Sequence, residues 1–246
     1  MPGLSPVVRS SPSMLTVPLS LAALGAILGA TLAMPHAADG WRWLGWVCKP
    51  LATALALVLA WSAVAPVSRR YRRCMLAGLL ACLVGDVFLM LPGDLFVPGL
   101  VSFLVGHFCF IAAFTGDVRF AARPWPWLAC LAAGALVAWL LWPALAPGLR
   151  VPVLVYVAAL ASMAGQALGR ARWLGERRDP CAASARLAGM GGVLFMCSDT
   201  LLAWERFRGG VPWPALLVLG TYYAALWLLA RSVDRTAGAG GQAEPR

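Results

Sequence analysis

Long apolar stretches alternate with short polar or charged stretches along almost the whole chain. Eight apolar stretches are each about 18 to 22 residues long, and Pro, Gly and Arg residues separate them. A helix of about 20 apolar residues crosses the hydrocarbon core of a bilayer. The pattern therefore predicts an all-α fold, a polytopic membrane bundle of about eight transmembrane helices. These are expected at roughly 14–34, 44–65, 74–91, 96–116, 125–143, 151–172, 186–204 and 212–233.

The predicted helices belong to one unit. Residues 1–235 are predicted to form a single integral membrane domain, and residues 236–246 (TAGAGGQAEPR) a disordered polar tail, because this end is rich in Gly and poor in apolar side chains. The first apolar stretch follows Arg9, as in a secretory signal, but it is longer than the 7–15 apolar residues of such a signal. We therefore expect it to stay in the protein as a transmembrane helix.

Composition excludes a soluble globular protein. Hydrophobic residues make up 61% of the chain and charged residues 12%, against about 45–50% and about 25% in soluble domains. The net charge of +10 would fit a nucleic-acid partner, but the basic residues gather between the apolar stretches, without an interleaved aromatic or Gly-rich motif of the RNA-binding type. Short basic loops are typical of the cytoplasmic side of membrane proteins. We therefore expect no nucleic-acid partner.

The distribution of Lys and Arg predicts an orientation. With both the N-terminus and the C-terminus in the cytoplasm, fifteen basic residues lie inside and four outside, and Lys49 lies within the second helix. The bias predicts this topology, in a bacterial inner (plasma) membrane. The inside set is Arg9, Arg69, Arg70, Arg72, Arg73, Arg119, Arg123, Arg170, Arg172, Arg177, Arg178, Arg186, Arg231, Arg235 and Arg246, and the outside set is Arg42, Arg150, Arg206 and Arg208.

The chain offers no pattern for a metal or cofactor site. Its seven cysteines are scattered without a CxxC pair, and it contains only two histidines. Cysteine within an apolar stretch behaves as a small hydrophobic residue. We therefore predict no disulfide framework, no metal and no cofactor.

Ionisable side chains within the apolar stretches are few. They are Lys49, Asp86, His107 and Asp199. A charge at membrane depth costs about 2.5 kcal/mol or more, so such residues are candidates for function. At 1.5 Å per residue from the cytoplasmic edge, Asp86 and Asp199 both lie about 20 Å into a core of about 30 Å. Their equal depth predicts that they meet at one cavity.

Two carboxyl groups in a low dielectric do not both ionise cheaply, so one is expected to keep its proton. A neutral acid beside a carboxylate is suited to acid/base catalysis, and we predict Asp86 and Asp199 as catalytic residues. A proton or ion relay and a structural polar clamp remain alternatives. The predicted substrate-binding or supporting residues are Lys49, His107, Tyr156, Arg206, Tyr222 and Tyr223.

Several of these supporting residues have a second interpretation. Lys49 is expected either to bind a phosphate or neutralise an aspartate, or to extend its side chain to the membrane interface. Arg206 is expected either to contact a lipid phosphate or to serve as an interfacial anchor. Of the neighbours Tyr222 and Tyr223, only one faces the cavity, because adjacent residues of a helix point about 100° apart.

A parallel internal repeat is also predicted, with the third and fourth helices resembling the seventh and eighth. Arg73 precedes Asp86 by thirteen residues, and Arg186 precedes Asp199 by thirteen. In the next helix of each pair, a Val-Pro dipeptide (97–98 and 211–212) is followed eight residues later by Gly. Four helices separate the copies, so both run in the same direction. The alternative is coincidence in a chain of low complexity.

The same residues carry a family resemblance. The segments GDVFLML at 85–91, FVPGLVSFLVGH at 96–107, GVLFMCSDTLLAWERF at 192–207 and TYY at 221–223, followed by ARSV at 230–233, resemble the YhhN family of membrane proteins. Lys49-Pro50 fits the family pattern as well. Four separated motifs occur in the right order over roughly residues 40–235, which makes the resemblance specific. The family's two aspartates fall on Asp86 and Asp199.

The resemblance implies an eight-helix enzyme, since characterised members of the family are lysoplasmalogenases. Such an enzyme hydrolyses the vinyl-ether bond of a lysoplasmalogen, a lysophospholipid of the membrane, and releases a fatty aldehyde and glycerophosphoethanolamine or glycerophosphocholine. Leu226 and Phe110 depart from the family pattern, where Gln and Tyr are common, and both remove polar groups from the expected cavity.

Two other classes of function fit the residues alone. Acids at membrane depth and a parallel repeat also describe a proton-coupled transporter or lipid carrier. Few Gly or Pro residues interrupt the apolar stretches, apart from Lys49-Pro50, which argues against broken transport helices. A structural membrane scaffold is the third class, and it predicts that the two aspartates are replaceable by asparagine.

Overall fold

A computed structural model describes residues 12–33 and 39–237 of the chain. In these residues eight helices are long and apolar enough to cross a membrane, which confirms the predicted all-α bundle. The helices are α1 (Pro12–Leu32), α2 (Asp39–Trp61), α3 (Arg69–Met90), α4 (Phe96–Phe114), α5 (Pro124–Leu141), α6 (Pro147–Glu176), α7 (Ala182–Phe207) and α8 (Pro214–Arg231), with a 3-10 turn at Trp142–Ala144 after α5.

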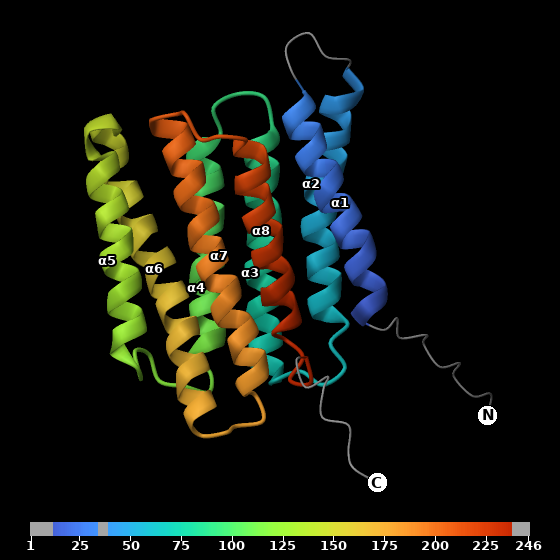
Figure 1. Ribbon diagram of the computed structural model, residues 1–246, viewed down its shortest axis with the longest axis vertical. Helices are drawn as coiled ribbons and strands as arrows, with labels where there is room; N and C mark the ends of the chain where they lie inside the picture. The colour runs from blue at the N-terminus through green and yellow to red at the C-terminus, as the bar shows by residue number, and fades with distance from the viewer. Residues whose placement is uncertain (1–11, 34–38, 238–246) are drawn as a thin grey trace, which may run out of the picture.

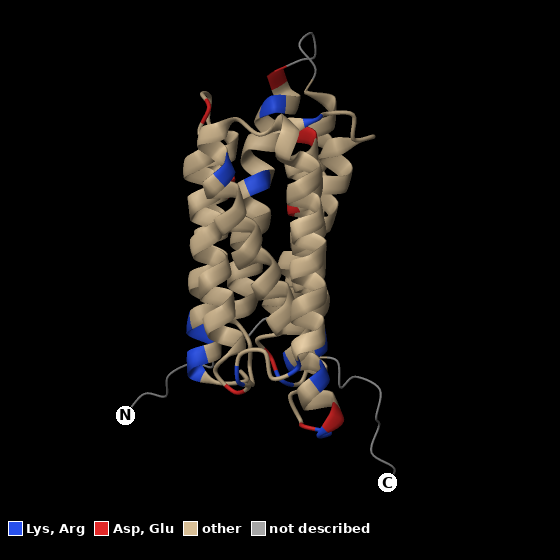
Figure 2. Ribbon diagram, turned by 90° about the vertical axis from the view of Figure 1, so that its left-hand side faces the viewer, with Lys and Arg blue, Asp and Glu red and all other residues tan. Residues whose placement is uncertain are grey.

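Consecutive helices run antiparallel, so their connections alternate between the two ends of the bundle (Figure 1). The α2–α3, α4–α5 and α6–α7 connections lie at one end, and the α3–α4, α5–α6 and α7–α8 connections at the other. The helices α1 and α2 form one edge, α5 and α6 the other, and the remaining four lie between them. Figure 2 shows that the charged residues of the described part gather mainly at the two ends, as expected of a bundle with an apolar middle band.

Residues suited to helix starts stand where the helices begin. Pro124, Pro147 and Pro214 occupy first-turn positions, where their lack of an N–H costs no hydrogen bond. Before α3, the Ser68 side chain accepts a hydrogen bond of 3.0 Å from the N–H of Tyr71. The helices α3 and α6 begin at Arg69 and Pro147, before the expected starts at 74 and 151.

Small residues allow close packing between neighbouring helices. A Cβ atom on Gly29 of α1 would lie 2.3 Å from the Gly45 nitrogen of α2, and one on Gly78 of α3 would lie 2.3 Å from the Phe110 ring of α4. Only a glycine fits at either position. Association of helices in lipid depends on such close approach, because the hydrophobic effect does not drive it there.

The segment after α8 is hydrogen-bonded to the loop between α2 and α3. Asp234 accepts hydrogen bonds from the N–H groups of Val64 (3.1 Å) and Thr236 (2.9 Å) and from the Thr236 hydroxyl (2.7 Å). The Arg235 N–H donates to the Ala65 carbonyl at 2.9 Å. Thr236 therefore lies in a turn, and residues 238–246 of the predicted tail lie outside the described residues.

Acid is expected to weaken this connection. Burial raises the pKa of Asp234, but hydrogen bonds from Thr236 and Val64 outweigh it, so the pKa of Asp234 lies below its usual value. Such a carboxylate stabilises the fold above its ordinary pKa of about 3.9, and this contribution is lost as the pH falls through the lower folded value. We expect Asp234→Asn to be less stable than wild type at neutral pH, and the difference to shrink below about pH 4. Thermal unfolding of both proteins in detergent over this pH range measures the difference in stability. A difference that stays constant with pH would contradict the prediction.

Candidate functional site

A polar cavity of about 280 Å³ lies between α2, α3, α4, α7 and α8, near the end of the bundle that carries the α3–α4 loop. Five charged residues from three helices and one loop meet on its wall. They are Lys49, Asp86, Asp94, Asp199 and Arg206, with Tyr222 beside them. Residues 93–95 of the α3–α4 loop form part of its rim. Five of the eight predicted site residues therefore line one cavity.

Asp86 is held by groups from two neighbouring helices. The Thr53 hydroxyl of α2 and the Tyr222 hydroxyl of α8 donate hydrogen bonds to its Oδ2 atom, at 2.6 and 2.7 Å. The ammonium group of Lys49 lies 3.7 Å from its Oδ1 atom. The side chain of Asp86 is only 2% exposed, so these groups replace the water that a carboxylate otherwise requires.

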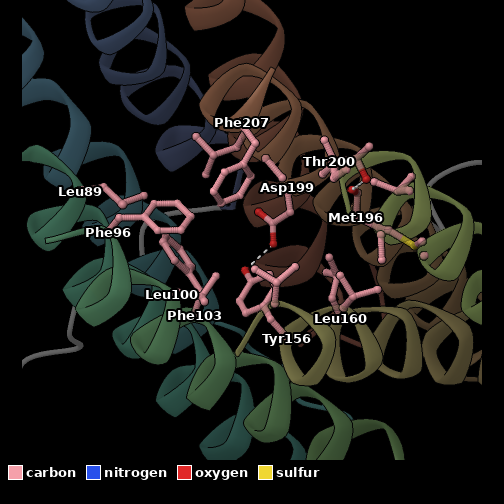
Figure 3. Close-up of a pocket in the computed structure, with 18 residues that line it drawn as sticks. Leu89, Phe96, Leu100, Phe103, Tyr156, Leu160, Met196, Asp199, Thr200 and Phe207 are labelled. Carbon is pink, nitrogen blue, oxygen red and sulfur yellow. Dashed lines mark hydrogen bonds between the residues drawn. The ribbon is translucent and has the colours of Figure 1, made fainter. Parts of the chain in front are cut away.

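Asp199 is held in a similar way by α6 and α4. The Tyr156 hydroxyl donates a hydrogen bond of 2.5 Å to Asp199 Oδ2, and the two side chains point toward each other in Figure 3. The His107 Nε2 atom lies 3.1 Å from the Tyr156 oxygen and 3.6 Å from Asp199 Oδ2. His107 is fully buried behind Tyr156, and its Nδ1 atom has no hydrogen-bond partner in the described residues. His107 therefore reaches the cavity through Tyr156 and Asp199.

The surroundings of the two aspartates correspond to each other. Asp86 on α3 is contacted from α2 and α8, and Asp199 on α7 is contacted from α6 and α4. A shift of four helices relates one set of elements to the other. This correspondence agrees with the predicted internal repeat, which stays a prediction.

A second, apolar cavity adjoins the polar one, between α4, α5, α6 and α7 (Figure 3). Asp199 is the only charged residue among the described residues that line it. Both cavities share part of their wall. The shared residues are Leu89, Phe96, Phe103, Asp199 and Leu202.

The remaining predicted residues lie at the margins of the site. Arg206 stands at the rim of the polar cavity, where its Nη2 atom donates to both carboxylate oxygens of Asp94 at 2.9 Å. Tyr223 does not line the polar cavity, and its hydroxyl donates to the Lys49 carbonyl oxygen at 3.4 Å. Only Tyr222 of the adjacent pair faces the cavity, as predicted.

Sequence reasoning did not identify Thr53 as part of the site. Threonine is common in apolar helices, where its hydroxyl usually donates to a carbonyl one turn earlier in the same helix. Thr115 and Thr200 do this here. Thr53 instead donates to Asp86, which only the packing of α2 against α3 reveals.

Replacing Tyr156 with phenylalanine is expected to lower turnover. The change removes the hydrogen bond to Asp199 and the polar contact with His107, while the ring still fills its place. A hydrogen bond to a charged group contributes about 1.5–3 kcal/mol, so kcat should fall by about 10- to 150-fold with little change in KM. Steady-state kinetics with the substrate proposed below measure this, and an unchanged kcat would show that Tyr156 only packs against Asp199.

Known proteins match this chain over the region that contains the site. A model described as the YhhN family matches residues 44–233. A protein named lysoplasmalogenase from Mycobacterium tuberculosis is 34% identical over 180 residues, which are 70% of this chain and 64% of that protein. Lysoplasmalogenase TMEM86B from Rattus norvegicus is 34% identical over 191 residues, 78% of this chain and 72% of the relative. The resemblance predicted from the motifs is confirmed.

The uncharacterized membrane protein YhhN of Escherichia coli O6:H1 is 26% identical over 211 residues, 85% of this chain and 97% of the relative. The chain spans less than two thirds of the length of the mycobacterial relative, 64%. No solved structure matches the chain. With the eight apolar helices, these matches identify an integral, multi-pass membrane protein.

Proposed function

Because the chain belongs to the YhhN family, we propose that it is a membrane-embedded lysoplasmalogenase. It hydrolyses the vinyl-ether bond of a lysoplasmalogen to a fatty aldehyde and glycerophosphoethanolamine or glycerophosphocholine. Relatives named lysoplasmalogenase, from bacteria and from mammals, support the activity. The observation that carries the proposal is that Asp86 and Asp199 lie on the wall of one cavity, each held by a tyrosine hydroxyl from a neighbouring helix.

The proposed reaction is the hydration of an enol ether. One aspartic acid of the pair donates its proton to the vinyl carbon that is not bonded to oxygen, and an oxocarbenium ion forms. The other aspartate stabilises this cation and then takes a proton from the water that attacks it. The hemiacetal that results collapses to the aldehyde and the glycerol hydroxyl. The pair ends with one proton, as it began, so no cofactor takes part in the proposed steps.

The remaining residues hold the aspartates and the lipid. Thr53 and Tyr222 fix the orientation of Asp86, and Tyr156 with His107 fixes Asp199. Lys49 and Arg206, which both line the polar cavity, supply positive charge for the phosphate of the head group. Arg206 pairs with Asp94, so binding of phosphate exchanges one anion for another.

We further propose that the polar cavity opens toward the outer side of the inner membrane. Its rim includes residues 93–95 of the α3–α4 loop, at the end opposite the arginine cluster at the start of α3. The excess of Lys and Arg on connections at that opposite end supports a cytoplasmic position for them and for both termini. Labelling of single cysteines introduced at Gly93 and Gly175 by an impermeant reagent, in a variant lacking the native cysteines, tests the topology. Labelling of position 93 only from inside the cell would reverse it.

The activity is tested with purified protein in detergent. A lysoplasmalogen, an acyl lysophospholipid and a saturated alkyl-ether analogue are incubated in parallel, and aldehyde and fatty acid are followed by mass spectrometry. Aldehyde from the vinyl ether alone is the expected result. Release of fatty acid would indicate a different lipid hydrolase. The absence of product from all three, together with movement of intact labelled lipid across vesicles, would indicate a lipid carrier.

A further inference from the structure

The wall of the apolar cavity is chemically suited to a hydrocarbon chain. Its wall exposes almost only carbon atoms, and the two polar side chains beside Asp199 already have internal partners. The Thr200 hydroxyl donates to the Met196 carbonyl at 2.8 Å, and the Tyr156 hydroxyl to Asp199. A polar ligand would therefore lose its hydration there without gaining hydrogen bonds, whereas each buried CH₂ group gains about 0.8 kcal/mol.

The two cavities share a wall, and their chemistry matches the two parts of a single lipid molecule. The polar cavity carries Lys49 and Arg206, which suit a phosphate, and the apolar cavity suits an alkenyl chain. In a lysoplasmalogen the vinyl-ether group joins the chain to the glycerol. A lipid that places its phosphate in the first cavity and its chain in the second must therefore place this group at the shared wall. Asp199 is the only ionisable residue of that wall in the described structure.

We propose that the apolar cavity holds the alkenyl chain of the substrate and that Ala138 and Ala203 determine how long a chain it accepts. Both residues line this cavity and not the polar one, and both are small. Ala138 on α5 is 3% exposed, and Ala203 on α7 packs against the buried cluster of Leu141, Leu145 and Val153. A larger side chain at either position occupies space that the chain needs.

This placement of the lipid gives the two aspartates different roles. Asp199 lies at the vinyl carbons and Asp86 on the side of the glycerol and phosphate, next to Lys49. The proton that reaches the alkenyl chain is therefore carried by Asp199. This assignment rests on the proposed function, whereas the chain-binding role of the cavity does not require hydrolysis.

The test compares Ala138→Leu and Ala203→Leu with wild type. Ala135→Leu is the matched control, since Ala135 lies on the same helix as Ala138 but is exposed on the outer surface. Each protein is given a lysoplasmalogen with an octenyl chain and one with an octadecenyl chain. We expect both variants to lose about tenfold or more of kcat/KM for the long chain relative to the short one, and the control to keep the wild-type ratio.

A binding measurement separates this inference from the activity. Saturated alkyl-ether lysophospholipids of the same two lengths, which are not hydrolysed, are added to each protein and the shift in thermal unfolding is recorded. The long analogue is expected to stabilise wild type and Ala135→Leu more than Ala138→Leu or Ala203→Leu. Equal stabilisation of all four proteins would overturn the chain cavity, even if aldehyde is released. No aldehyde from wild type, with the length-dependent stabilisation intact, would overturn the proposed hydrolysis and leave the chain cavity standing.

Discussion

Replacing Asp199 with asparagine is expected to lower the rate of aldehyde release from a lysoplasmalogen by about two to four orders of magnitude. Asparagine has nearly the same shape and still accepts the hydrogen bond from Tyr156, but it neither gives nor takes a proton at the pH of the reaction. The loss should therefore appear in kcat, with substrate binding kept. Single-turnover measurements with detergent-solubilised protein separate the two.

Asp86→Asn is expected to cause a loss of similar size, because the pair needs both members to deliver one proton and to accept another. Asp39→Asn serves as the control, since Asp39 is exposed at the start of α2. Full hydrolysis by Asp86→Asn, with a confirmed substrate, would reduce Asp86 to a structural partner of Lys49, Thr53 and Tyr222. Full hydrolysis by both variants would exclude the carboxyl pair as the source of catalysis.

Removing the carboxylate of Asp117 is expected to destabilise the protein by about 3–5 kcal/mol, because it leaves a buried cation without its partner. Arg170 of α6 has a fully buried side chain, and its Nε and Nη2 atoms donate to Asp117 at 2.8 and 2.6 Å. Its guanidinium lies 4.9 Å from the ring centroid of Tyr71 on α3. The pair therefore connects α6 with α3 and with the loop after α4.

The partner substitution is expected to be less damaging. Arg170→Met removes the buried charge and fills most of its space, and Asp117, with a third of its side chain exposed (33%), keeps contact with water. Unfolding of Asp117→Ala and Arg170→Met in the same detergent measures which variant loses more stability. A larger loss in Arg170→Met than in Asp117→Ala would show that packing of the arginine, and not its charge, determines the stability of this region.

The sequence predicted the eight helices well, because an apolar stretch of about 20 residues has the length of a helix that crosses the bilayer core. It predicted their ends less well. The helix α2 begins at Asp39, five residues before the expected start, and α6 continues to Glu176, four residues past the expected end. Charged residues and tryptophans are stable in a helix that emerges at the interface, so the end of an apolar stretch is not the end of its helix.

The site was predictable where a residue type is costly in a membrane. Asp86 and Asp199 stand out for this reason. Gln166 does not, although its amide accepts the Ala121 N–H at 2.9 Å and donates to the Phe114 carbonyl at the end of α4. A glutamine in an apolar stretch resembles an ordinary polar residue, and its role depends on which helix end it meets. Pairing of Arg206 with Asp94 was missed for the same reason, since 112 residues separate them.

The boundary between the two cavities has a consequence for the products. A lysophospholipid is an amphiphile with one chain, and the proposed hydrolysis at Asp199 cuts it at the point where its apolar part meets its water-soluble part. The aldehyde stays soluble in lipid, with about 0.8 kcal/mol of transfer free energy for each CH₂ group, and the glycerophospho group is soluble only in water. In the proposed reaction the aldehyde therefore forms in the apolar cavity and leaves into lipid. The glycerophospho group forms in the polar cavity and leaves into water. A molecule with surfactant character enters, and two molecules that largely lack this character depart in different directions.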